Sequence, residues 1–101
     1  MKTIYVRICA DNKFGYDIVS ANMYKEYPEY GVAITKTNLH GDYYRITDIK
    51  SGLHCNRLFK KLKNAKSFME HTEEANFKNW YDAVQKARTT ERYSKLILKV
   101  R

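Results

Sequence analysis

Six basic residues stand between positions 50 and 66 with no acidic residue among them: Lys50, Arg57, Lys60, Lys61, Lys63 and Lys66. An ordinary exposed face mixes both signs of charge, so a stretch of one sign indicates a surface that meets a polyanion or an acidic protein. Arg57 is the best candidate for a bidentate contact, because a guanidinium donates two parallel hydrogen bonds to a phosphate or a carboxylate. The alternative is an ordinary solvated face, on which these side chains have no partner.

The charge of the whole chain follows the same division. Residues 1–49 carry six basic and six acidic side chains, so the formal net charge of +8 arises entirely in residues 50–101. A basic half of this kind favours contact with the phosphate backbone of a nucleic acid, or with an acidic groove on a protein.

Tyrosine is the second residue type that could form a binding surface. The chain has nine tyrosines, and Tyr24, Tyr27 and Tyr30 recur at every third position around Pro28. Tyrosine rings stack on bases or anchor protein interfaces, because each ring is large and has a polar end. The alternative is that they cover the sheet, since tyrosine is common in strands. We interpret these three as interface residues.

Catalysis has weaker support in the sequence. A ribonuclease that uses no metal needs an acid, a base and a cation around the phosphate. Side chains of these types occur late in the chain, at His71, Arg88, Arg92 and Tyr93. Small bacterial toxins that cleave messenger RNA share this size and basic charge, but in them the helices precede most of the strands. Nucleophile, phosphate-loop and dinucleotide motifs are absent. We therefore assign no catalytic residue and expect no enzyme activity.

Metal and cofactor binding are not predicted. Cys9 and Cys55 are far apart, and with the three histidines they do not have the spacing of zinc ligands. Two reduced thiols are favoured over a disulfide. There is no apolar run of about 18 residues and no apolar leader at the start, so we expect no membrane span and a cytoplasmic protein.

Alternating apolar residues predict the strands that must position these side chains. The predicted strands cover residues 3–10, 16–20, 31–37, 43–49 and 53–59. Residues 21–27 are ambiguous, since their composition permits a short helix that ends near Pro28. Lys50-Ser51-Gly52 is predicted to form a tight turn.

Helical spacing replaces alternation after residue 60. A short helix is indicated by Leu62, Ala65, Phe68 and Met69; a second, beginning after Thr72, is indicated by Phe77, Trp80, Tyr81, Val84 and Ala87. Residues 93–100 are predicted to form a final strand. The chain is therefore expected to be a single α+β domain over residues 1–101, with a mainly antiparallel sheet of four to six strands packed against two helices. Two helices on one face would leave the other face of the sheet open.

Part of the chain resembles a group of known proteins. The segment Tyr44–Leu53 with its Ser51-Gly52 turn, then Leu58-Phe59, then Leu62–Phe68, is similar to small accessory proteins of phages and mobile elements. The likeness covers about a quarter of the chain. It implies a single-domain product of the kind that includes anti-CRISPR inhibitors, which occupy a nucleic-acid channel or a contact surface of a host nuclease. Because this chain is basic, the mechanism would not be mimicry of DNA.

The sequence therefore predicts a non-enzymatic protein that binds a nucleic acid or a nucleoprotein such as a Cas nuclease complex, in the host cytoplasm if the gene belongs to a phage. One alternative is a metal-independent ribonuclease toxin of a toxin–antitoxin pair. Another is a structural module or homo-oligomer that pairs through the edge of the predicted last strand, at Leu96–Leu98.

Overall fold

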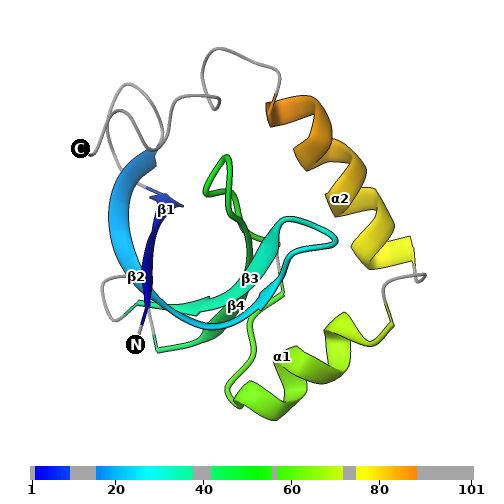
Figure 1. Ribbon diagram of the computed structural model, residues 1–101, viewed down its shortest axis with the longest axis horizontal. Helices are drawn as coiled ribbons and strands as arrows, with labels where there is room; N and C mark the ends of the chain where they lie inside the picture. The colour runs from blue at the N-terminus through cyan, green and yellow to red at the C-terminus, as the bar shows by residue number, and fades with distance from the viewer. Residues whose placement is uncertain (1, 10–15, 38–41, 56, 72–74, 89–101) are drawn as a thin grey trace.

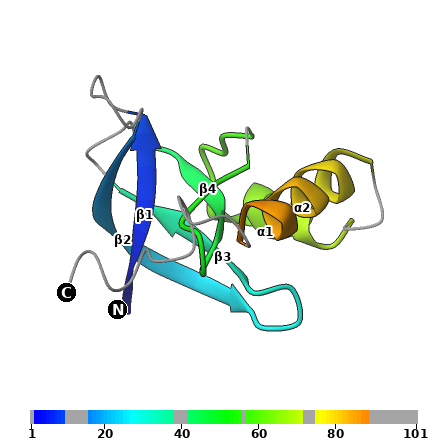
Figure 2. The same cartoon turned by 90° about the horizontal axis from the view of Figure 1, so that it is seen from above.

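The structure is a computed structural model, and it describes residues 2–9, 16–37, 42–55, 57–71 and 75–88 (Figure 1). Its elements follow the order β1 (Thr3–Cys9), β2 (Tyr16–Tyr27), β3 (Val32–Lys36), β4 (Tyr44–Asp48), α1 (Leu62–Met69) and α2 (Ala75–Arg88). Both views place α1 and α2 together on one side of the sheet (Figures 1 and 2). The predicted α+β class, with an antiparallel sheet and two helices in the C-terminal half, is confirmed. The predicted last strand, residues 93–100, lies outside the described residues.

The four strands pair antiparallel in the order β1-β2-β3-β4. The short helix considered for residues 21–27 is wrong, because β2 continues through them and pairs with both neighbours: Ala21 lies opposite Ile4, and Tyr27 lies opposite Val32. The register shifts between Met23 and Lys25, so Tyr24 is an additional residue in β2. A bulge of this kind interrupts the alternation by which a strand is recognised in a sequence.

A turn after β4 returns to β1 and curls the sheet (Figure 1). The backbone N–H of Arg7 donates to the carbonyl of Gly52 over 2.8 Å, and the Arg7 side chain donates from Nε to the carbonyl of Ser51. The carboxylate of Asp48 accepts from the Ser51 backbone N–H (3.0 Å) and hydroxyl (2.6 Å). Gly52 has φ 74°, which only glycine adopts easily. The tight turn predicted here thus ties the first strand to the last.

The central strands are covered on both faces. The face toward the helices packs a cluster of Val32, Ile34, Ile46, Cys55, Phe59, Ala65, Met69 and Phe77. On the other face, the hydroxyls of Thr35 and Thr47 form a hydrogen bond of 2.7 Å, and both side chains are buried. Successive residues of a strand point to opposite faces, so the burial of every residue from Val32 to Thr35 requires cover on both sides. The expectation of an open second face is therefore wrong for the central strands, whose side chains are buried on both faces.

The segment between β4 and α1 is not the regular strand predicted for residues 53–59. It meets β4 at two isolated bridges, His54 opposite Thr47 and Phe59 opposite Tyr44. Five steps along this segment face three steps along β4, so the segment bulges away from the sheet between the bridges. Arg57 and Leu58 on the bulge are exposed, and Leu58 is 48% exposed.

The helices follow the predicted apolar spacing. Ala65 and Met69 of α1 are buried, and so are Phe77 and Val84 of α2. The Phe77 ring of α2 contacts both α1 and the turn after β2: its centroid lies 6.2 Å from that of Phe68 and 5.4 Å from that of Tyr30. The predicted cap at Thr72 lies outside the described residues.

Candidate functional site

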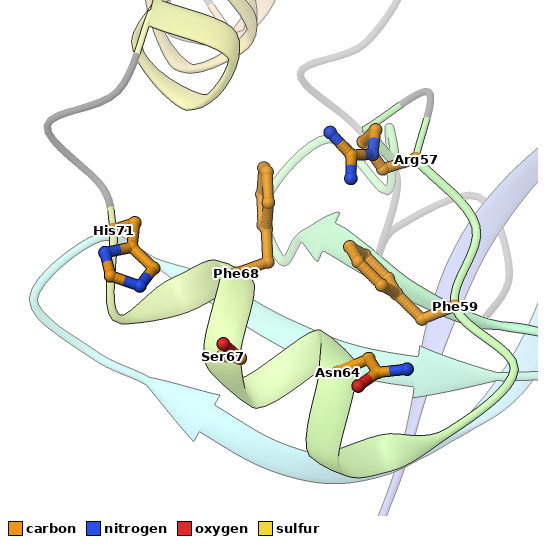
Figure 3. A pocket seen from close by; sticks show the side chains of 6 residues that line it. All are labelled: Arg57, Phe59, Asn64, Ser67, Phe68 and His71. Carbon is orange, nitrogen blue, oxygen red and sulfur yellow. The ribbon is translucent and has the colours of Figure 1, made fainter.

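An open pocket lies between the bulge that precedes α1 and the outer side of α1 (Figure 3). Its volume is about 360 Å³, and its walls are Arg57, Phe59, Asn64, Ser67, Phe68 and His71. No carboxylate is among these six residues, and one permanent cation is. The pocket therefore joins aromatic surface to hydrogen-bonding groups and a positive charge.

Pairing with β4 and the helical repeat of α1 together position the walls. Phe59 exchanges both backbone hydrogen bonds with Tyr44, over 2.8 and 3.0 Å, which fixes the end of the bulge against the sheet. On α1, Asn64, Phe68 and His71 follow at i, i+4 and i+7, so they share one side of the helix. The helix axis is held by Ala65, buried against the sheet. The pocket thus lies between one side of α1 and a segment that a backbone bridge fixes to β4.

Arg57 is the central residue of the pocket. Its guanidinium carbon lies 5.6 Å from the ring centroid of Phe68 and 5.8 Å from that of Phe59. These distances are typical of cation–π contacts, which orient a guanidinium without occupying its N–H groups. Within the described residues, Arg57 has no acidic partner at ion-pair distance. Toward this part of the chain, its charge and its donors are therefore available to an anionic ligand.

Two polar side chains and an imidazole complete the walls. Ser67 and Asn64 are exposed on α1, and His71 follows the last turn of the helix, where its backbone N–H donates to the carbonyl of Phe68 over 3.2 Å. Figure 3 shows Phe68 standing between His71 and Phe59, with Arg57 reaching over from the bulge. Hydroxyl, amide and imidazole groups both donate and accept hydrogen bonds. The walls can therefore bind the edges of a polar group as well as an anion.

The six predicted basic residues are not gathered on one surface. Lys60 and Lys61 are exposed just before α1, and Lys63 is exposed in its first turn. Each helical residue advances by about 100°, so Lys66 lies roughly 160° around α1 from Asn64, on the opposite flank. Lys50 follows β4 at the end away from Phe59, and β4 alone spans about 13 Å. By the same rotation, Lys63 lies roughly 60° from Lys66 and roughly 100° from Asn64, so it shares the flank of Lys66. Lys60 and Lys61 are the lysines nearest to Arg57 along the chain, and Lys50 is separated from them.

The tyrosines predicted as interface residues are half-buried against the core: Tyr24, Tyr27 and Tyr30. Tyr24 packs edge-on to Tyr44 at 5.0 Å, and Tyr30 packs likewise on Tyr81 at 5.9 Å. Burial raises the pKa of the Tyr27 hydroxyl, and the nearby carboxylates of Glu70 and Glu29 raise it further. All three have a packing role, and their part in an interface stays a prediction.

Phe59, Asn64, Ser67 and Phe68 were not recognised as site residues in the sequence. Phe68 has the spacing of a core residue, and periodicity alone does not distinguish a core ring from a pocket wall. The polar positions Asn64, Ser67 and His71 recur at i, i+3 and i+7, which is the signal that could have indicated a polar stripe beside the core. In the sequence, His71 is weighed as a ribonuclease residue and, with the other histidines, as a zinc ligand. Of the ribonuclease set, the structure places His71 in the pocket and Arg88 at the end of α2, and Arg92 and Tyr93 lie outside the described residues.

Two further expectations concern metals and membranes. Within the part of the chain that the structure describes, no three His, Cys, Asp or Glu side chains gather as metal ligands. Among the same residues, neither helix has the length and apolar character needed to cross a membrane. Cys55 is a buried free thiol in the core.

Comparisons with known proteins leave the geometry as the main guide to function. No protein family, no curated protein and no solved structure matches this chain.

Proposed function

We propose that the protein is a non-enzymatic binding domain that engages a nucleic acid, either free or within a nucleoprotein. One observation carries the proposal: Arg57 is held over Phe59 and Phe68 at the mouth of a pocket whose described walls include no carboxylate. A guanidinium stacked on rings keeps its N–H edges for a planar or tetrahedral anion, and phosphate fits this fork.

The charges around the pocket favour a polyanion over a single small anion. Lys60, Lys61 and Lys63 are exposed at and just before the start of α1. Exposed lysines that follow one arginine along the chain can contact several phosphates of a strand, and each phosphate contact releases counterions. The formal net charge of +8 also attracts a polyanion over a longer range.

The resemblance to accessory proteins of phages and mobile elements implies a class of partner for this surface. On this proposal the protein is an inhibitor that binds a Cas nuclease complex in the cytoplasm of the host, through its guide or target nucleic acid. Addition of purified protein to a Cas nuclease reaction should reduce cleavage, and the Arg57→Gln variant should reduce it less. Unchanged cleavage by the nucleases of the natural hosts would reject this part of the proposal.

The binding proposal is tested with labelled duplex DNA, single-stranded DNA and RNA over a series of salt concentrations. We expect binding that weakens steeply with salt, and that is lost when Lys60, Lys61 and Lys63 are changed to Glu. The matched control changes Lys2, Lys25 and Lys78 to Glu, which alters the net charge equally at three other exposed positions. Equal loss in both triple variants would show that net charge alone matters, and no binding by the native protein would reject the proposal.

A ribonuclease toxin is the second candidate, because His71 and Arg57 line the same pocket. In this reading His71 accepts the proton of a 2′-hydroxyl as that oxygen attacks the adjacent phosphate, water protonates the leaving 5′-oxygen, and Arg57 stabilises the charge on the phosphate. Expression should then arrest the host cell, and His71→Ala should abolish the arrest. If host cells grow normally while they express the native protein, and the purified protein cleaves no RNA in the presence of a metal chelator, the ribonuclease function is rejected and only the binding function remains.

A further inference from the structure

We infer that the pocket takes an unpaired nucleotide, with its base against the ring of Phe68 and its phosphate on Arg57, so that the protein prefers single strands to duplexes. This inference rests on the proposed nucleic-acid function and specifies its ligand. Its experiment below separates failure of the inference from failure of that function.

Of the two rings in the pocket, Phe68 is the one with exposed area that a base could contact. Phe59 is only 8% exposed and belongs to the core, whereas Phe68 is half-buried. Phe68 is supported by Phe59, at 5.5 Å and a 47° tilt, and by Phe77, at 6.2 Å and 61°. A supported ring with exposed area is a stacking platform, and every base has a face that can stack on it.

The remaining walls match the edge of a base. Asn64, Ser67 and His71 present amide, hydroxyl and imidazole groups, which pair with the donors and acceptors of an unpaired base. The volume of about 360 Å³ is near the lower end of small-molecule sites, which suits one base better than a base pair. In a duplex, stacking and pairing hide both the faces and the edges that these walls would contact.

The backbone on either side of that nucleotide has basic residues to contact. Arg57 stands at the mouth over Phe68, and Lys60 and Lys61 continue along the chain toward α1. Contacts of this kind carry affinity without sequence preference, whereas the pocket selects for an unpaired base. The expected ligand is therefore a single strand of RNA or DNA.

The experiment measures fluorescence anisotropy of a labelled single-stranded RNA, the same sequence as a duplex, and an abasic strand of equal charge. Native protein should bind the single strand at least about tenfold more tightly than either of the others. Phe68→Leu should lower single-strand affinity about fivefold or more, since one stacked base contributes roughly 1–3 kcal/mol, while the salt dependence stays unchanged. Phe68→Tyr keeps a ring and should retain the affinity.

Trp80→Leu is the matched control, because it removes another half-buried ring that also contacts Phe77, at 5.8 Å, but does not line the pocket. It should leave the preference for single strands intact. Equal affinity for the single strand and the abasic strand would overturn the inference while leaving the proposed function in place, and this arm needs no variant. Absence of binding to all three probes would reject both.

Discussion

Lys36 at the end of β3 and Arg57 on the bulge before α1 both lie over aromatic rings, and of these two only Lys36 has an acidic partner among the described residues. Lys36 lies 4.6 Å from the ring centroid of Tyr44, and its Nζ donates to Asp42 over 3.1 Å. Arg57 lies over the rings of Phe59 and Phe68 and has no such partner among the described residues. The two sites are adjacent, because Lys36 pairs with Tyr44 and Tyr44 pairs with Phe59.

The difference shows what makes a cation available for binding. The hydrogen bond to Asp42 raises the pKa of the Lys36 amino group, so its charge is stabilised from within the protein. At Arg57 the rings hold the guanidinium in place, and a ligand must supply the negative charge. A cation over a ring therefore indicates a binding site only where no carboxylate closes it.

The largest expected effect is on stability, from removal of the Phe77 ring that packs against Phe68 of the pocket. Phe77 is 2% exposed and contacts Phe68, Trp80 and Tyr81. Phe77→Ala should lower the free energy of unfolding by about 3–5 kcal/mol, since it leaves a cavity where α2 meets α1. Urea denaturation measures the change, and Phe77→Leu should lose less. A loss below about 1 kcal/mol would show that α2 does not support the pocket.

A carboxylate can be introduced beside Arg57 to imitate the effect of Asp42 on Lys36. Ser67→Asp places a carboxylate in the pocket wall, where it can pair with Arg57 and repel a phosphate. Affinity for a single-stranded RNA should fall about tenfold, which corresponds to roughly 1.4 kcal/mol. Ser67→Asn is the matched control without charge, and it should retain most of the affinity. Equal affinity in the two variants would contradict a phosphate contact in this pocket.

Conversely, the carboxylate that pairs with Lys36 can be removed. Asp42→Asn should return the pKa of the Lys36 amino group toward its ordinary value, because it removes the hydrogen-bonded carboxylate. NMR titration of the Lys36 side chain measures this shift. Any gain in nucleic-acid affinity should be small and limited to low salt, because salt screens the attraction between an isolated surface charge and a phosphate. A gain in RNA affinity as large as the loss in Ser67→Asp would show that Lys36 and Arg57 are equally able to bind nucleic acid.

The smallest effect concerns alkaline pH. The folded pKa values of Lys36 and Tyr27 are both raised, from ordinary values of 10.5 and 10.0. A raised pKa stabilises the protonated folded state, so this contribution is complete below the ordinary values and is lost as pH rises through the folded ones. Thermal melting between pH 8 and 11 should show the decline, and Tyr27→Phe should make it shallower. An identical decline in Tyr27→Phe would exclude Tyr27 as a contributor.

Much of the fold could be predicted because local patterns determine it. The alternation from Ile4 to Ile8 corresponds to β1, and the helical spacing from Phe77 to Val84 corresponds to α2. The pattern misled at residues 21–27, where the additional Tyr24 breaks the alternation of β2. Curling of the sheet depends on Arg7 meeting the Ser51 carbonyl, and a contact over that sequence distance leaves no local signal.

The candidate site was predictable only in part. Arg57 was singled out for its chemistry, and the structure places it at the mouth of a pocket. The basic stretch was treated as one surface, yet the helical turn sends Lys66 to the flank opposite Asn64. Phe68 has the same spacing as a core residue, and only the bulge at residues 57 and 58 turns its outer side into a wall.

The central claim is that, of the two cations held over rings at 36 and 57, Arg57 and not Lys36 contacts nucleic acid. NMR titration of ¹⁵N-labelled protein with a short single-stranded RNA tests it most directly, because the Arg57 Nε–H can be followed beside the backbone amides. The account predicts the largest shifts at Arg57 Nε and at the amides of Ser67, Phe68 and His71, with little change at Lys36 and Tyr44. Shifts centred on Lys36 and Tyr44, or none in the pocket while the RNA binds, would contradict it.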